Sequence, residues 1–224
     1  MYFGDKKLSE IAVSVPGSTS LLRKYDLDFC CGGSDTLANA AAEKGLNLAE
    51  IETRLTELQN SKAENPEEYW VNATYPEIID HILVRYHQRH REQLQELIVL
   101  ADRVESVHGD RDDCPIGVAA ELRNVYEDLS NHMMKEEHVL FPMIKAGNYM
   151  MAQMPIRMME MEHAEHGEHL DVLKSLTNNM TPPADACNTW RALYSGIQEF
   201  ADDLMMHIHR ENNILFPRVI AENH

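Results

Sequence analysis

Histidine and glutamate recur together at fixed spacings in the second half of the chain. His132 and Glu136 are four residues apart, as are His207 and Glu211, and a Leu-Phe-Pro triplet follows each pair. Residues four apart on a helix lie on one face, about one turn from each other. Each pair therefore offers an imidazole and a carboxylate to the same region, and this donor set suits a transition metal ion.

A second correspondence links the segments that precede these pairs. The segment that starts His-Gln-Arg-His at His87 aligns with the segment that starts His-Ala-Glu-His at His163. His87 lies 45 residues before His132, and His163 lies 44 residues before His207. The chain thus contains two helical hairpins of one design in tandem. Packed as an antiparallel bundle, they bring four imidazoles and two carboxylates into one central volume.

These six side chains predict a pair of metal ions. Buried carboxylates and buried imidazole nitrogens are costly without a cation. Each carboxylate can bridge two ions, so that each ion receives two histidines and two bridging oxygens, with room for an oxo or hydroxo bridge and a small ligand. Mixed nitrogen and oxygen donors with open positions favour non-haem iron over manganese or zinc. We therefore predict two iron ions bound by His87, His132, Glu136, His163, His207 and Glu211.

The remaining histidines are weaker candidates. His90 and His166 also keep register in the repeat, three residues after His87 and His163. They are the main rivals to the six ligands, and we interpret them as outer partners of the ligands or as surface residues. No ligand role is expected for His81, His108, His138, His169, His209 and His224.

Long helices must position the ligands. The spacing of apolar residues predicts four of them, at about 76–107, 115–146, 152–178 and 184–221. The proline after each Leu-Phe pair is expected to bend or end its helix. The paired methionines at 133–134, 150–151, 158–159 and 205–206 are interpreted mainly as core residues, with an apolar route for a diatomic gas as the alternative.

The first part of the chain has a different composition. Residues 1–60 contain no histidine and show short amphipathic runs, with Ser18 as a candidate cap of the second run and two further runs at 36–42 and 48–58. Residues 61–75 are mostly polar, contain Pro66 and are followed by Pro76, which predicts a linker. We expect an all-α fold, with a small helical domain at 1–60, this linker, and an up-down four-helix bundle at 76–224.

Two adjacent cysteines, Cys30 and Cys31, precede two glycines and are expected to lie on a flexible turn. Adjacent cysteines can form only a strained disulfide ring that is easily reduced. The pair is read either as a thiol site for redox chemistry or for transfer of iron or nitric oxide, or as two small buried side chains in a tight turn. The first interpretation is favoured. Cys114 and Cys187 are expected to be inert.

The composition excludes several classes of partner. Against 20 Lys and Arg residues stand 37 Asp and Glu residues, and the net charge is −17. Such a chain repels phosphate backbones and anionic lipids, so neither nucleic acid nor membrane is expected as a partner. No apolar run approaches the roughly 18 residues of a membrane-spanning helix. Four cysteines do not form a secreted disulfide framework, and a cytoplasmic location is expected.

Two motifs resemble one family. LRKYDLDFCCGG at 22–33 and HMMKEEHVLFPMI at 132–144 are similar to the iron–sulfur cluster repair di-iron proteins (the RIC family), which carry a hemerythrin-like domain after a short cysteine-bearing domain. The resemblance covers essentially the whole chain. It implies iron as the cofactor, with the same six ligands, and damaged or apo iron–sulfur proteins as partners. It also implies reaction with nitric oxide or other small diatomic ligands.

Other functions remain open at this point. A di-iron enzyme that reduces nitric oxide or nitrite would show sustained turnover with an electron donor. A hemerythrin-like gas sensor or carrier would bind gas reversibly and keep its iron. A structural zinc bundle would lack the absorption of iron. The sequence also leaves open whether the chain forms a homodimer.

Overall fold

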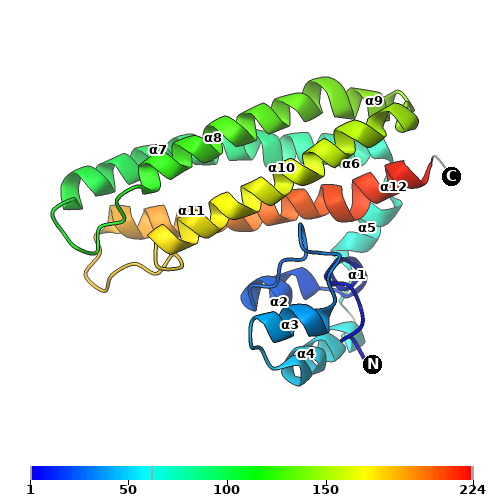
Figure 1. Cartoon of the computed structure of the whole chain (residues 1–224), viewed down its shortest axis with the longest axis horizontal. Coiled ribbons are helices and arrows are strands. Elements are labelled where there is room, and N and C mark those ends of the chain that lie inside the picture. The colour runs from blue at the N-terminus through cyan, green and yellow to red at the C-terminus, as the bar shows by residue number, and fades with distance from the viewer. Residues whose placement is uncertain (1, 62, 223–224) are drawn as a thin grey trace. The chain divides into compact units, whose positions relative to one another are not determined.

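The computed structural model describes residues 2–61 and 63–222, most of which are helical. Contacts divide the chain into two compact units: residues 1–78 together with 206–224 form unit 1, and residues 79–205 form unit 2. Within the described ranges the only β pairing is one isolated bridge between Lys7 and Thr36. The prediction of an all-α fold is therefore confirmed (Figure 1).

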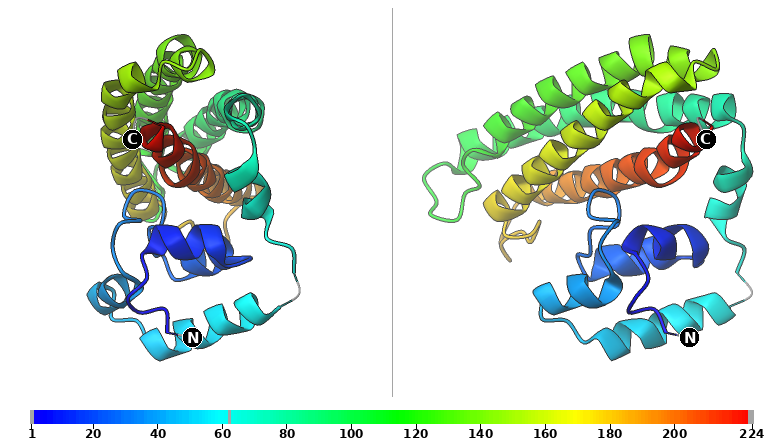
Figure 2. Two further views of the ribbon diagram at one scale, coloured as in Figure 1. Left: turned by 90° about the vertical axis from the view of Figure 1, so that its right-hand side faces the viewer. Right: turned by 45° about the vertical axis from the view of Figure 1, so that its right-hand side comes forward.

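Long antiparallel helices build unit 2, as Figures 1 and 2 show. Its elements, the first and last of which extend into unit 1, are α6 (Tyr75–Ile82), η1 (Leu83–His87), α7 (Gln88–His108), α8 (Val118–Lys135), η2 (Glu136–Leu140), α9 (Phe141–Lys145), α10 (Tyr149–Leu176) and α11 (Asn188–Arg210). An early residue of one helix meets a late residue of its neighbour in the pairs Arg123–Asp102, Glu121–His169 and Arg85–Asp203. These elements match the four predicted helices closely, and the up-down order is confirmed.

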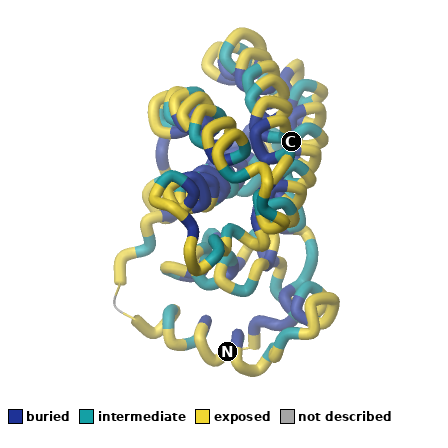
Figure 3. The backbone as a smooth tube through the Cα atoms, turned by 90° about the vertical axis from the view of Figure 1, so that its left-hand side faces the viewer, coloured by how far each residue is buried: buried dark blue, intermediate teal, exposed yellow. Residues whose placement is uncertain are grey.

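The apolar face of each long helix also carries its candidate ligand. In α8, the buried residues include Val125, Leu129 and His132, which follow one another at helical spacing. The burial of the apolar neighbours therefore directs the imidazole inward, because residues at this spacing share one face. Figure 3 colours buried residues dark blue and shows them along the long helices together with exposed residues in yellow.

His169 links α10 to α8. Its Nδ1 lies 2.6 Å from Glu121 Oε1 and its Nε2 lies 3.0 Å from Asp128 Oδ2. Burial lowers the pKa of His169, but the hydrogen bonds to the two carboxylates outweigh burial and raise this pKa above its ordinary value. Because the pKa of His169 is higher in the folded state, the contacts of its charged ring with the two carboxylates stabilise the fold fully below about pH 6.5. This stabilisation is lost as the pH rises through the pKa of the folded state.

The His169→Gln variant should therefore show a pH-dependent loss of stability. We expect it to lower the free energy of unfolding by about 1 kcal/mol near pH 6, and by clearly less near pH 9. Denaturant titrations at the two pH values measure the difference. Glu165→Gln, at an exposed position of the same helix, is the matched control. Equal losses at both pH values would contradict the assignment.

Short helices build unit 1. They are α1 (Leu8–Ser14), α2 (Ser18–Lys24), α3 (Leu37–Glu43), α4 (Leu48–Asn60), α5 (Pro66–Asn72), η3 (Glu211–Leu215) and α12 (Phe216–Ala221). Helix α1 packs against α2, α5 and η3. The core of this unit consists of fully buried apolar side chains, among them Phe3, Ile11, Leu22, Phe29 and Ile51.

Ser18 does not cap α2, contrary to the prediction. Gly17 occupies the cap position with a φ of 73°, a left-handed conformation that glycine adopts without steric cost. The buried Ser18 hydroxyl instead lies 2.8 Å from the carbonyl oxygen of Ile11 and 2.7 Å from that of Val15. The serine thus ties α2 back to α1.

Helix α5 lies inside the polar segment for which a linker was predicted. Asn65 caps it by accepting a hydrogen bond from the backbone N–H of Glu67 (3.2 Å), and Pro66 occupies its first turn. Proline is favoured there because its missing N–H would have no helical partner. Composition alone did not reveal the helix, since it is short and lies in a segment that is otherwise polar.

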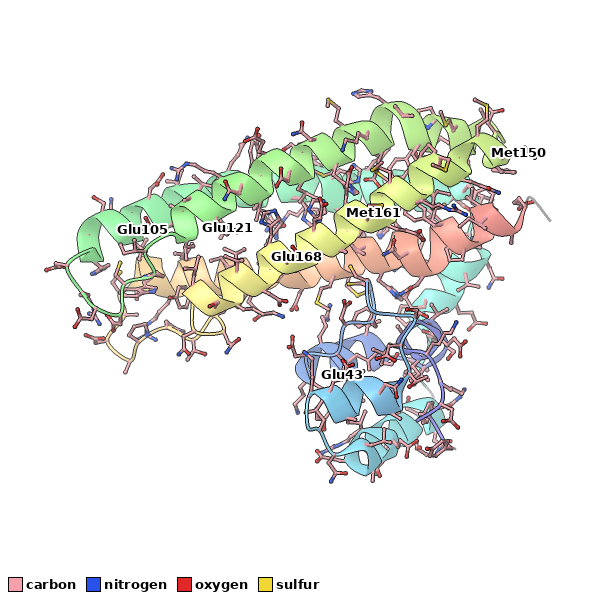
Figure 4. The ribbon with its side chains drawn as sticks, viewed as in Figure 1. Glu43, Glu105, Glu121, Met150, Met161 and Glu168 are labelled. Atoms are coloured by element: carbon pink, nitrogen blue, oxygen red, sulfur yellow. The ribbon has the colours of Figure 1, made fainter. Side chains whose placement is uncertain are left out.

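The methionines divide into two groups. Met133 and Met159 are buried, as predicted, whereas Met150 and Met158 are exposed. Figure 4 labels Met150 and Met161 on the outer surface of α10. The prediction that the paired methionines fill the core is therefore wrong for about half of them.

In the part of the chain that the structure describes, no helix combines the length and the apolar character that a membrane span requires.

Candidate metal centre

Four of the six predicted ligands meet in the interior of unit 2. His87 ends η1, His132 lies on α8, Glu136 begins η2 and His163 lies on α10, and all four are at most 1% exposed. Glu136 Oε2 lies 3.3 Å from His87 Nε2 and 3.4 Å from His132 Nε2. The Nε2 atoms of His132 and His163 are 3.1 Å apart.

Each of these pairwise distances suits two ligands of one cation. Two donors that each lie about 2.1 Å from one ion at right angles are about 3 Å from each other. Two imidazole nitrogens that face each other at 3.1 Å need a proton or a metal ion between them, because both present lone pairs. Imidazole nitrogens and a carboxylate oxygen at these distances fit borderline transition metal ions such as iron.

Two further carboxylates orient the ligand rings. His87 Nδ1 lies 2.8 Å from Glu137 Oε1, and His132 Nδ1 lies 2.9 Å from Glu162 Oε2. An Nδ1–H that donates to a carboxylate leaves the Nε2 lone pair free for a metal ion. The sequence pattern did not reveal either residue, although each directly adjoins a predicted ligand: Glu137 follows Glu136, and Glu162 precedes His163.

A cation pairs with each of these carboxylates. Arg91 Nη2 lies 2.7 Å from Glu137 Oε1, and Lys135 Nζ lies 2.6 Å from Glu162 Oε1. The hydrogen bond to His87, supported by Arg91, lowers the pKa of Glu137 to about 2. The hydrogen bond to His132, supported by Lys135, lowers the pKa of Glu162 to about 2. Both groups are therefore carboxylates throughout the neutral pH range.

The Glu162→Gln variant should bind metal about 10-fold to 100-fold more weakly than the wild type, because the His132 ring loses its charged partner. The Glu137→Gln variant should show a loss of the same order through His87. Competition with a chelator measures both affinities. Glu165→Gln, at an exposed position of α10, should leave the affinity unchanged, and an equal loss in this control would contradict the assignment.

Three π turns lie at predicted ligands. His87 is the last residue of η1, Glu136 is the first of η2 and Glu211 is the first of η3. π turns occur frequently at functional sites. Pro142 and Pro217 follow η2 and η3 closely, and a proline cannot donate the N–H of a regular α turn. The helices therefore continue through these prolines, although a bend or an end was expected there. The wide π turn before each proline accommodates the backbone N–H that proline lacks.

The other two predicted ligands lie in unit 1. His207 and Glu211 are completely buried, and His207 Nε2 lies 3.3 Å from Glu211 Oε1. The i,i+4 spacing thus brings the two side chains together, as it does for His132 and Glu136. Both halves of the sequence repeat have the same local geometry.

The two rival histidines are also buried. The His90 ring stacks on Tyr86 with the ring centroids 6.1 Å apart, and His90 Nδ1 lies 3.4 Å from Gln93 Oε1. His166 meets the ring of His132 edge-on at 4.9 Å. Among the described residues, neither belongs to a group of side chains whose donor atoms converge as metal ligands do. His166 instead packs against a candidate ligand.

His209 has partners that sequence analysis did not reveal. Its Nε2 lies 3.4 Å from Glu67 Oε2, and its ring meets Phe29 edge-on at 5.3 Å. The Glu67 carboxylate also forms two hydrogen bonds with the guanidinium of Arg210. This buried group of Glu67, His209 and Arg210 joins α5 to the end of α11. No sequence signal links residues so far apart.

The cysteine turn is held firmly. Asp28 Oδ1 accepts hydrogen bonds from the backbone N–H groups of Cys30 (3.0 Å) and Cys31 (2.9 Å), and Asp28 Oδ2 accepts one from Gly32 (2.9 Å). A side chain at Gly33 would come within 2.5 Å of the Phe29 carbonyl oxygen. Cys30 is buried and Cys31 is partly exposed. The Asp28 side chain therefore constrains the backbone of the turn for which flexibility was expected.

The other two cysteines lie in unit 2. Cys114 is partly exposed, and Cys187 is exposed with its Sγ 3.3 Å from His108 Nε2. Both cysteines are free thiols.

Comparisons with known proteins agree with this geometry. The family model of the hemerythrin HHE cation binding domain matches residues 78–219, and that of a domain of unknown function (DUF542) matches residues 4–59. The chain is 68% identical over 222 residues to a probable iron–sulfur cluster repair protein of Haemophilus influenzae, with 99% of this chain and 100% of that protein covered. It is 54% identical over 221 residues to the iron–sulfur cluster repair protein YtfE of Musicola paradisiaca, with 98% of each covered.

Proposed function

Because this chain belongs to the family of iron–sulfur cluster repair proteins, we propose that it repairs iron–sulfur clusters damaged by nitrosative or oxidative stress, with iron drawn from a di-iron centre in its bundle. The observation that carries the proposal is the meeting of His87, His132, Glu136 and His163 in the interior of unit 2. Bound iron would supply a cation that can be released to a client protein. The four side chains named above would hold that cation.

The register of α11 supports His207 and Glu211 as the last two ligands. The ring of Phe200 meets the ring of His90 edge-on at 5.4 Å, which directs this face of α11 toward the interior of unit 2. His207 and Glu211 follow Phe200 by seven and eleven residues, and these spacings keep a helical residue on one face. We infer that Glu136 and Glu211 bridge two iron ions, each of which also binds two histidines.

The cysteine turn belongs to the same proposal. Cys30 and Cys31 would act as thiols that receive iron or nitric oxide. A contact of the turn supports this role. Asn212 donates a hydrogen bond to the carbonyl oxygen of Cys30 (3.0 Å) and directly follows Glu211, one of the predicted ligands. The clients would be damaged or apo iron–sulfur proteins in the reducing cytoplasm, where thiols stay reduced. The matches at 4–59 and 78–219 support the division into domains at 1–60 and 76–224.

One experiment tests the proposed function. The purified full chain should contain about two iron ions. It should restore the activity of an enzyme whose iron–sulfur cluster has been damaged by nitric oxide. The iron content of the chain should fall during this reaction. The Glu136→Gln variant is the negative control. Absence of reactivation by the iron-loaded chain would overturn the repair function.

The alternatives give different results in the same assay. Sustained consumption of nitric oxide or nitrite with an electron donor, and with iron retained, would indicate a di-iron enzyme. Reversible gas binding with iron retained and no dependence on Cys30 or Cys31 would indicate a sensor or carrier.

A further inference from the structure

The two thiols of the cysteine turn are separated as ligands of one metal ion would be. The Sγ atoms of Cys30 and Cys31 are 3.8 Å apart, far beyond the distance of about 2 Å in a disulfide. Two sulfurs that each lie about 2.3 Å from one tetrahedral ion are about 3.8 Å from each other. Asp28 Oδ1 lies 3.2 Å from Cys30 Sγ, so a carboxylate oxygen adjoins the sulfur pair. Donor atoms of all three residues lie within 4.8 Å of one another.

The fold holds these donors in place from both sides. The Asp28 carboxylate binds the backbone N–H groups of the turn, as described above. Asn213 donates to the Phe29 carbonyl oxygen (2.8 Å) and Asn212 to that of Cys30 (3.0 Å). The turn therefore needs little rearrangement when an ion binds, and preorganised donors favour binding.

The charges of the cluster also favour a cation. Two thiols and a carboxylate lie together, and thiolates in such a group repel one another and the carboxylate. A metal ion would displace the thiol protons into solvent and neutralise the group, so its binding should release protons.

We propose that Asp28, Cys30 and Cys31 bind one divalent metal ion of borderline softness, at a site separate from the centre in the bundle. Thiolate donors select Fe²⁺, Co²⁺ and Zn²⁺ over Mg²⁺ and Ca²⁺. Structural zinc sites have four protein ligands, whereas a site with three keeps a position open for water or for a ligand of another protein. Cys31 is partly exposed, so the open position is reachable. The ion is therefore exchangeable, and its assignment as Fe²⁺ in transit to a client rests on the proposed function.

Cobalt titration of the reduced full chain tests the site. Co²⁺ bound by thiolates has a near-ultraviolet sulfur-to-cobalt charge-transfer band, which histidine and glutamate ligands in the bundle do not produce. We expect one equivalent of this band in the wild type. Cys30→Ser and Cys31→Ser should abolish it, with more than about 100-fold weaker binding, since loss of a direct ligand exceeds the 10-fold to 100-fold effect of an outer partner. Asp28→Asn, which keeps an oxygen for the turn, should weaken binding about 10-fold.

Two controls separate this site from others. Cys187→Ser removes an exposed thiol of unit 2 and should leave the band unchanged. Glu136→Gln should also keep the band, so a failure of the di-iron centre or of cluster repair is distinguishable from a failure of this site. Absence of the band in the wild type would overturn the proposal, as would its persistence in Cys31→Ser. Unchanged affinity in a correctly folded Asp28→Asn variant, checked by circular dichroism, would overturn the carboxylate as a ligand.

Discussion

The Glu136→Gln variant should lose most of its bound iron, with an affinity lower than that of the wild type by more than about 100-fold. Glu136 Oε2 lies within 3.4 Å of Nε2 of both His87 and His132, and in the proposed centre its carboxylate would bridge the two ions. A carboxamide has nearly the same shape but no charge, and it bridges two cations poorly. Iron analysis of the purified variant and chelator competition measure the loss.

The outer carboxylates provide a graded comparison for this result. Glu137→Gln should cost less than Glu136→Gln, because Glu137 acts on the metal only through the His87 ring. Two iron ions bound by Glu136→Gln with the affinity of the wild type would remove Glu136 from the ligand set. An equal and large loss in the exposed-site control Glu165→Gln would point to a general defect of the preparation instead.

The Arg210→Met variant of the metal-free chain should unfold with a free energy lower by about 3–5 kcal/mol. Arg210 and Glu67 are both buried and meet through two hydrogen bonds. Burial raises the pKa of Glu67, but the hydrogen bonds with His209 and Arg210 outweigh burial and lower this pKa, so Glu67 is ionised. Without Arg210, the buried Glu67 carboxylate loses a positively charged partner. Denaturant unfolding measures the loss, and the metal-free state avoids a contribution from bound ions.

A double variant distinguishes the ion pair from simple loss of side-chain volume. Glu67→Leu combined with Arg210→Met should be much closer to the wild type than Arg210→Met alone, since no unpaired charge remains. Arg54→Met, at an exposed position of α4, should change the stability by less than about 0.5 kcal/mol. Additive losses in the double variant would contradict the buried pair as the cause.

Much of the fold was predictable because it follows from local spacing. Apolar residues at helical intervals predicted the long helices to within a few residues, and the comparisons confirm the family resemblance of the two motifs. Local rules failed where a tertiary contact decided the outcome. Serine is a residue type that often caps helices, yet the Ser18 hydroxyl contacts the carbonyl oxygens of Ile11 and Val15. Methionine is an apolar residue type that is common in protein cores, yet Met150 is exposed.

The candidate site shows the same division. The tandem repeat identified all six candidate ligands, four of which meet within unit 2, because a ligand has to keep its register. Glu162 and Glu67 were not marked by the alignment of the two halves of the repeat. Each is one of many glutamates in a strongly acidic chain, and only the packing of distant segments shows which histidine or arginine it contacts.

The π turns give the bundle a freedom that a uniform helix lacks. A π turn contains one residue more than an α turn, and one residue corresponds to about 100° of rotation. The helix before η2 can therefore present His132 to the metal, while Leu140, Phe141 and Ile144 beyond it still face the core. If the same residues formed a regular α turn, the apolar face beyond η2 would instead be rotated by about 100° toward solvent. Each π turn thus acts as a phase shift, which lets the ligand face and the packing face of one helix be set independently.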